Sequence, residues 1–124
     1  MRLRAVLLLL LACAAAIAIT PTERILRLRD CTSMTITPTG KDTFPVFGRD
    51  RVRSLAVFFD VSASSVRDEV GGAKLYKLSF FRDSEKPTDV LWVKANGLWG
   101  FENEPAAYGK DPRIIRWIEK TLKG

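Results

Sequence analysis

Three stretches of the chain alternate between apolar and polar positions with a period of two, which predicts β-strands. They cover residues 32–37, 51–61 and 74–82. The middle of residues 51–61 is apolar on both sides, so we expect this strand at the centre of a sheet. Residues 41–48 are expected to form a loop, and residues 62–70 fit either a short helical turn or a weak strand.

A β-hairpin around Asn96 and Gly97 is the clearest local signal in the sequence. Asn-Gly between apolar runs favours a two-residue loop in which both residues take positive φ. In the register of such a loop Lys94 faces Trp99, and alternate side chains point to opposite faces of the sheet. One face of the hairpin would then carry Trp92, Lys94, Trp99 and Phe101.

This aromatic hairpin face has two interpretations. Large aromatic side chains on an open surface are typical of partner binding, which makes these four residues the candidate contact residues. The same side chains would form a second small core if the loop containing Phe44 and Phe47 covered them. The sequence leaves both interpretations open.

The C-terminal residues have the pattern of an amphipathic helix. Asp111 is a good N-cap and Pro112 suits the first helical position, and apolar residues follow at positions 114, 115, 118 and 122. A helix stripe and a sheet face bury each other, so we expect the helix to cover the aliphatic face of the hairpin. The predicted fold is therefore α+β, with an antiparallel sheet of about five strands and a C-terminal helix packed on one face.

The first residues have the layout of an export signal. Arg2 and Arg4 precede an apolar run, and small residues follow up to Ala18. A basic start, a short apolar stretch and a small-x-small site are typical of a secretory signal peptide. We therefore expect residues 1–18 to be a signal peptide, residues 19–124 to be one small domain, and the protein to be periplasmic or extracellular.

Two other fates of this segment compete with cleavage. Leu10-Leu11-Ala12-Cys13 resembles the lipobox of bacterial lipoproteins, which implies that Cys13 becomes the acylated first residue of a membrane-attached protein. Alternatively, the segment stays as an uncleaved anchor. The apolar run is shorter than the roughly 20 residues that cross a bilayer, which favours cleavage.

The chain contains no histidine, which removes whole classes of chemistry. Ser-His-Asp and Cys-His catalysis need a histidine base, and zinc sites use histidines or several cysteines. No spacing typical of a phosphate-binding or calcium-binding loop is present. We therefore expect no cofactor and no metal. Cys31 has no cysteine partner once Cys13 is removed with the signal, so it is either a buried small hydrophobe or the site of an intermolecular disulfide.

The net charge is +6, and part of the excess lies in three alternating arginines. On an extended chain, side chains two positions apart project from the same side about 7 Å apart. Such a stripe would suit anionic lipid head groups, acidic polysaccharide or nucleic acid, but basic residues on an exposed strand also guard against edge-to-edge pairing. Export argues against nucleic acid. The candidate stripe is Arg49, Arg51 and Arg53.

These observations favour a small exported protein without enzymatic activity that binds a protein or an envelope component, as an inhibitor or an immunity-type protein does. A carboxylate-based hydrolase is the first alternative, with Asp60, Glu102 and Glu104 as the suggestive acids. A membrane-anchored envelope lipoprotein with a structural role is the second.

Overall fold

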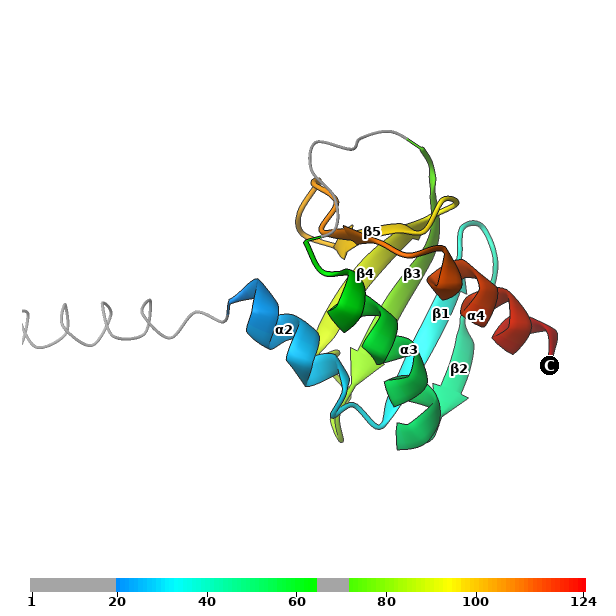
Figure 1. Cartoon of the computed structure of the whole chain (residues 1–124). Coiled ribbons are helices and arrows are strands. Elements are labelled where there is room, and N and C mark those ends of the chain that lie inside the picture. The colour runs from blue at the N-terminus through cyan, green and yellow to red at the C-terminus, as the bar shows by residue number, and fades with distance from the viewer. Residues whose placement is uncertain (1–19, 65–71) are drawn as a thin grey trace, which may run out of the picture.

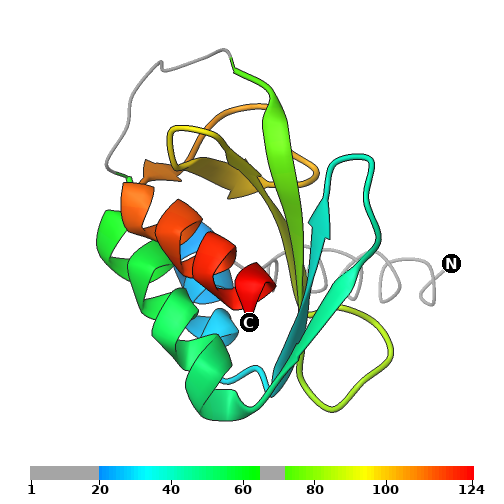
Figure 2. The ribbon, with the colours of Figure 1, turned by 90° about the vertical axis from the view of Figure 1, so that its right-hand side faces the viewer.

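The structure, a computed structural model, describes residues 20–64 and 72–124 and has two layers (Figure 1). One layer is an antiparallel sheet, and the other is formed by helices that lie side by side on one face of that sheet (Figure 2). The predicted signal segment with Cys13 and most of the ambiguous stretch 62–70 lie outside the described residues. Within the described residues, no helix has the length and apolar character needed to span a membrane.

The sheet has six strands, not the five predicted, in the order β2-β1-β3-β4-β5-β6, and all neighbours are antiparallel. The predicted strands at 32–37 and 74–82 are confirmed as β1 and β3. Two strands were not predicted: β2, in the expected loop 41–48, and the short β6. The bounds are β1 Ser33–Pro38, β2 Phe44–Phe47, β3 Lys74–Phe81, β4 Asp89–Lys94, β5 Leu98–Phe101 and β6 Gly109–Lys110.

The prediction of a central strand at 51–61 was wrong, because these residues form the helix α3, Arg49–Ser62. Its apolar run also fits a helical stripe, since the buried residues recur at intervals of three and four. They are Val52, Leu55, Ala56, Phe59 and Ser62. The side chains that a strand would have placed on two faces therefore lie on one, against the sheet.

A further helix, α2 (Pro21–Leu28), follows directly after the predicted signal segment and was not predicted. The Thr20 hydroxyl accepts a hydrogen bond from the Glu23 amide at 3.2 Å, and Pro21 stands at the first helical position, where its missing N–H costs nothing. Ile25 and Leu28 are buried. This short helix is therefore held by its cap, by two buried apolar side chains and by the ion pair of Arg24 with Asp89 at 2.7 Å.

The predicted C-terminal helix is confirmed as α4, Pro112–Lys123, with Asp111 as its N-cap. The Asp111 carboxylate accepts a hydrogen bond from the Arg113 amide at 3.0 Å. Ile114 and Ile118 are buried beneath the helix. The prediction that a C-terminal helix packs on one face of the sheet is therefore correct.

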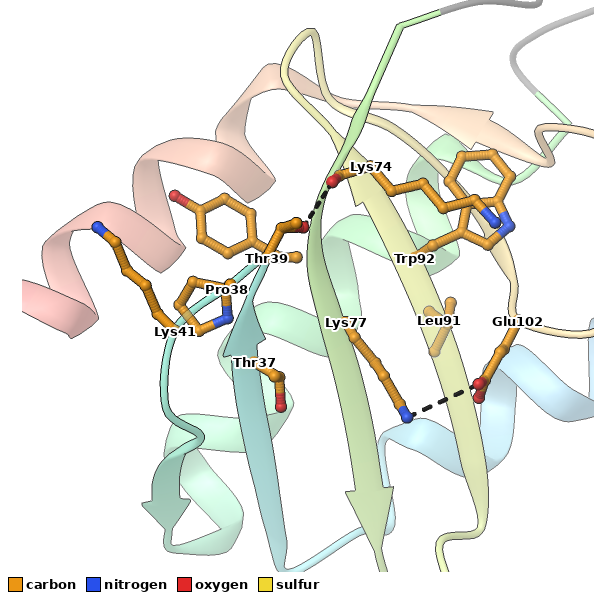
Figure 3. Close-up of a pocket in the computed structure, with 11 residues that line it drawn as sticks. Thr37, Pro38, Thr39, Lys41, Lys74, Lys77, Leu91, Trp92 and Glu102 are labelled. Atoms are coloured by element: carbon orange, nitrogen blue, oxygen red, sulfur yellow. Dashed lines mark hydrogen bonds and ion pairs between the residues drawn. The ribbon is translucent and has the colours of Figure 1, made fainter.

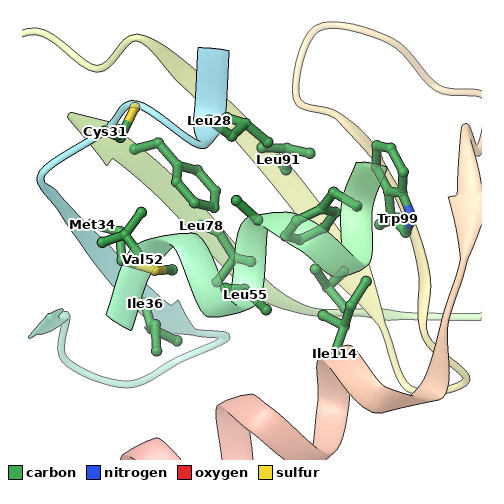
Figure 4. Close-up of a cluster of buried hydrophobic side chains, with 14 of the residues drawn as sticks. Leu28, Cys31, Met34, Ile36, Val52, Leu55, Leu78, Leu91, Trp99 and Ile114 are labelled. Carbon is green, nitrogen blue, oxygen red and sulfur yellow. The ribbon is translucent and has the colours of Figure 1, made fainter. Parts of the chain in front are cut away.

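The core lies between the helices and the sheet (Figure 4). Phe59 of α3 packs edge-on against Phe80 of β3 and Trp99 of β5, with ring centroids 6.1 and 4.9 Å away. All three helices cover the same face, so the other face of the sheet is left without a helical layer (Figure 2). We call this other face the open face.

Candidate functional site on the open face of the sheet

The β4–β5 hairpin has a register one residue away from the predicted one. Val93 pairs with Trp99 and Trp92 pairs with Gly100, so three residues rather than two form the loop. Gly97 takes a φ of +87°, whereas Asn96 does not take a positive φ. The Asn96 side chain instead accepts a hydrogen bond from the Leu98 amide at 3.1 Å. A one-residue slip moves side chains to the opposite face.

The predicted aromatic hairpin face is therefore divided between the two sides of the sheet. Trp99 and Phe101 are fully buried in the core beneath the helices. Val93 pairs with Trp99 and faces the core with it. Trp92 and Lys94 are the neighbours of Val93 along β4, and successive side chains of a strand point to opposite faces, so both lie on the open face. The four candidate contact residues do not form one surface.

Trp92 is nevertheless the centre of a second, smaller arrangement on the open face. Its ring packs over Gly100, and its indole N–H donates to the Glu104 carbonyl at 3.1 Å. The ammonium groups of Lys74 and Lys94 lie 5.4 and 5.0 Å from the ring centroid. Cations at this range are attracted to an indole face, so Trp92 holds two lysines in place while remaining only 3% exposed.

A groove of about 280 Å³ opens beside Trp92 (Figure 3). Its walls come from the end of β1 and the β1–β2 loop on one side, and from β4 and the residue after β5 on the other, with β3 between them. The lining residues whose side chains carry polar groups are Thr37, Thr39, Lys41, Lys74, Tyr76, Lys77, Trp92 and Glu102. The groove therefore joins segments far apart in the sequence.

The lining of the groove is predominantly basic. Lys41, Lys74 and Lys77 reach it from three positions, and Glu102 is the one carboxylate among its lining residues. Glu102 lies 3.7 Å from the ammonium of Lys77. The positive charge of the other two lysines is not matched by an acid in this lining, so the lining carries a net positive charge.

The hydroxyls of the groove position its backbone. Thr39 donates to the Lys74 carbonyl at 2.7 Å, which ties the β1–β2 loop to the start of β3. Thr37 shares a hydrogen bond of 2.9 Å with Thr43 across the same loop. Lys41 and Lys74 are thus carried on segments that are fixed to each other.

Phe47 is the most exposed large apolar side chain of the described residues, at 71%. It lies at the end of β2, and because its neighbour Val46 is buried in the core, Phe47 points to the open face. Ser33 of β1 is its partner across the ladder. The open face therefore carries a basic groove near the end of β1 and a bare aromatic ring near its beginning.

The candidate arginine stripe lies on a helix and not on a strand. Arg49, Arg51 and Arg53 occupy the first turns of α3, and all three are exposed. Residues two apart on a helix do not face each other. The spacing of about 7 Å along one side, expected for an extended chain, is therefore wrong.

The three candidate acids each pair with a different cation. Asp60 of α3 lies 3.6 Å from Arg29, and Glu104 lies 3.6 Å from Arg24. Glu102 borders the open-face groove, whereas Asp60 belongs to the helical layer, so the sheet separates these two. In the part of the chain that the structure describes, no group of three His, Cys, Asp or Glu side chains is placed to hold a metal ion.

Cys31 is buried, as the first of the two interpretations predicted. Its thiol donates to the Arg27 carbonyl at 3.5 Å, and burial raises the pKa of this thiol. A buried, protonated thiol is a poor nucleophile and a poor metal ligand. Cys31 therefore belongs to the core.

The groove lysines were not among the candidates taken from the sequence. Lys77 is a polar position of the predicted strand 74–82, but Lys41 lies in a segment expected to be a plain loop. Lys41 and Lys77 line one groove because β1 pairs with β3 across more than 30 intervening residues. No local sequence pattern predicts this pairing.

Comparison of the chain with protein-family models, with curated proteins and with solved structures gives no match. The functional conclusion therefore depends on the geometry of the site.

Proposed function

We propose that the chain is an exported, non-enzymatic binding protein that holds an acidic segment of a partner protein on the open face of its sheet. Export is inferred from the layout of residues 1–18. The single observation that supports the binding site is the groove that is lined by three lysines, one from the β1–β2 loop and two from β3, and by one carboxylate.

Charge complementarity selects the occupant. Opposite charges across an interface steer association and reject partners of the same sign. Lys41 and Lys74 lie on rigidly connected backbone, so their ammonium groups are presented in a fixed region. Carboxylates of Asp and Glu side chains are the complementary groups that a protein surface offers.

The size of the groove favours a protein segment over a whole small molecule. Pockets that enclose a drug-sized ligand have volumes of about 300–1,000 Å³, and this groove holds about 280 Å³. It has room for one or two side chains of a larger partner. Phe47, on the same face, supplies an exposed aromatic residue of the kind that anchors protein interfaces.

Titration of the ¹⁵N-labelled protein with hexaglutamate tests the proposal, using the indole N–H signals of its three tryptophans. We expect the Trp92 signal to move, because Lys74 and Lys94 lie over that ring. Trp99 is buried in the core, so its signal serves as an internal reference. Trp117 belongs to α4, so a shift of its signal would report binding to the basic helices instead of the groove. Hexalysine at the same concentration should leave all three signals unchanged.

Two double variants of equal charge provide the control. Lys74→Gln with Lys77→Gln removes two groove lysines and should weaken hexaglutamate binding roughly tenfold. Arg82→Gln with Lys86→Gln removes the same charge from the exposed β3–β4 connection, outside the groove, and should weaken binding less than about twofold. Equal weakening by both would contradict the site. Pyrophosphate binding as tightly as hexaglutamate would indicate a small-anion site instead.

A further inference from the structure

We infer that the helical layer docks on the surface of an anionic lipid bilayer, with α3 at the centre of the contact. This interaction is separate from the proposed binding on the open face. The contact surface consists of the outward sides of α2, α3 and α4, which lie side by side over the sheet (Figure 1).

The positive charge excess of the described residues lies in this layer. Segments 20–30, 49–62 and 111–124, which contain the three helices, carry ten basic and six acidic residues. The rest of the described chain carries seven basic and six acidic residues. The strands and loops are thus close to neutral, and the helices give the molecule a basic side.

Most of these basic side chains are available to a surface. Three of the ten are engaged in ion pairs, namely Arg24 with Asp89 at 2.7 Å, Arg29 with Asp60 at 3.6 Å and Arg113 with Asp111 at 2.7 Å. Five of the seven others are arginines, whose planar guanidinium matches phosphate oxygens. These seven exposed basic residues are Arg27, Arg49, Arg51, Arg53, Arg116, Lys120 and Lys123.

Exposed apolar side chains occur in the same layer. Val57 and Val61 are 36% and 61% exposed, and Leu26 of α2 is 45% exposed. Arg53, Val57 and Val61 of α3 are four residues apart. One basic and two apolar side chains therefore lie one after another along the outer side of this helix. Basic residues combined with protruding apolar ones are typical of surfaces that bind the bilayer interface.

The exposed apolar side chains favour a bilayer over an acidic polymer, and an N-terminal segment that is kept would add to this preference. The described chain begins at Thr20, the N-cap of α2, so residues 1–19 join the molecule at the helical layer. Acylation of Cys13, or retention of the apolar run, would therefore tether this face to the membrane. An acidic polysaccharide would use the arginines but would gain nothing from Leu26, Val57 and Val61.

The docked orientation leaves the open-face groove free. Lys77 and Trp92 of the groove lie on the side of the sheet opposite to the helices (Figures 2 and 3). Contact with lipid through α3 therefore does not cover Lys41, Lys74 or Lys77, and the two interactions can coexist.

Co-sedimentation with vesicles tests the inference, using the protein with the N-terminus it carries in its native host. The vesicles are phosphatidylcholine alone or with about 30% phosphatidylglycerol. Arg49→Gln with Arg53→Gln should lower partition onto the anionic vesicles roughly 25-fold, about fivefold per arginine. Val57→Ser with Val61→Ser should lower it about tenfold and should still do so at high salt, where charge is screened.

The control is again Arg82→Gln with Lys86→Gln, which removes the same charge away from the helical layer and should change partition less than about threefold. All variants share one N-terminus, so its contribution cancels in each ratio. If circular dichroism shows that the variant Arg49→Gln with Arg53→Gln has lost its fold, Arg116→Gln with Lys120→Gln replaces it. Equal losses in the test and control variants would mean attraction by net charge alone. No loss in any variant would mean attachment by the N-terminus alone, and either result overturns the inference.

Discussion

Val93 faces Trp99 across the β4–β5 hairpin, and this pairing places the two tryptophans of the hairpin on opposite sides of the sheet. The Trp99 indole N–H donates to the Ser62 hydroxyl inside the core at 2.9 Å. The Trp92 indole N–H donates to the Glu104 carbonyl on the open face at 3.1 Å. One tryptophan therefore stabilises the fold, and the other supports the groove.

Gly100 is the position on β5 that makes room for Trp92. A Cβ added to Gly100 would overlap the Trp92 ring and would lie 2.8 Å from the Ala106 carbonyl oxygen. Gly100→Ala should therefore destabilise the protein by about 1–3 kcal/mol, the usual cost of overpacking. Urea unfolding measures the change.

Gly124→Ala is the control for this prediction, because a Cβ there meets nothing within 4 Å. Its effect should stay within about 0.5 kcal/mol. The Trp92 indole signal should shift in Gly100→Ala and stay in place in Gly124→Ala. A Gly100→Ala variant as stable as the parent would show that the 104–106 segment moves away at little cost.

Two tryptophan–serine hydrogen bonds of equal length allow the contribution of a buried hydrogen bond to stability to be compared with that of an exposed one. Trp99 donates to Ser62 and Trp117 donates to Ser54, both at 2.9 Å, but the first bond is buried and the second is exposed. Ser62→Ala leaves a buried indole N–H without its acceptor, which should cost about 1–3 kcal/mol. Ser54→Ala should cost less than about 0.5 kcal/mol, because water replaces the hydroxyl.

Denaturant unfolding of both serine variants measures the difference. Replacing the donor as well, with Trp99→Phe in the Ser62→Ala background, should show a coupling energy between the two sites. Equal costs for Ser62→Ala and Ser54→Ala would mean that solvent reaches Trp99.

Local sequence patterns predicted the elements in which the local pattern and the packing in the fold favour the same secondary structure. In α4 the cap, the proline and the apolar spacing all indicate a helix, and in β1 the alternation matches its half-buried position. In α3, five consecutive residues from Leu55 to Phe59 are apolar, and such a run fits a buried strand and a helical stripe equally. Tertiary packing beneath α3 decided between them.

The functional surface was harder to predict because it depends on register and strand order. Asn96-Gly97 indicates a hairpin, but a two-residue and a three-residue loop differ by one residue, and that difference reverses the sides of Trp92 and Trp99. Lys41 and Lys77 line one groove only because β1 pairs with β3. Their polarity was visible in the sequence, but their proximity was not.

Burial of Cys31 should protect its thiol from alkylation. The side chain is fully buried, and burial raises the pKa of the thiol, so little reactive thiolate forms in the native state. Iodoacetamide at pH 8 should modify Cys31 on the order of 100-fold more slowly in native protein than in urea. Mass spectrometry of the peptide containing Cys31 measures the rate, and equal rates would place the thiol at the surface.

Asp111 should make the stability of the protein depend on acidic pH. The Arg113 guanidinium hydrogen-bonds the carboxylate at 2.7 Å and lowers the pKa of Asp111. A carboxyl group whose pKa is lower when folded stabilises the protein above its unfolded pKa of about 3.9. That contribution is lost as the pH falls through the lower folded pKa.

Urea unfolding between pH 2 and pH 7 separates the charge of Asp111 from its role as a cap. Asparagine is also a good N-cap, so Asp111→Asn removes mainly the charge, and its destabilisation should be full near pH 7 and shrink below about pH 4. Asp111→Ala also loses the cap and should cost about 1 kcal/mol more. Arg113→Gln should flatten the pH dependence, because the lowered pKa comes chiefly from its hydrogen bond. If Asp111→Asn were equally destabilised at pH 2 and pH 7, the carboxylate would act through its shape and not through its charge.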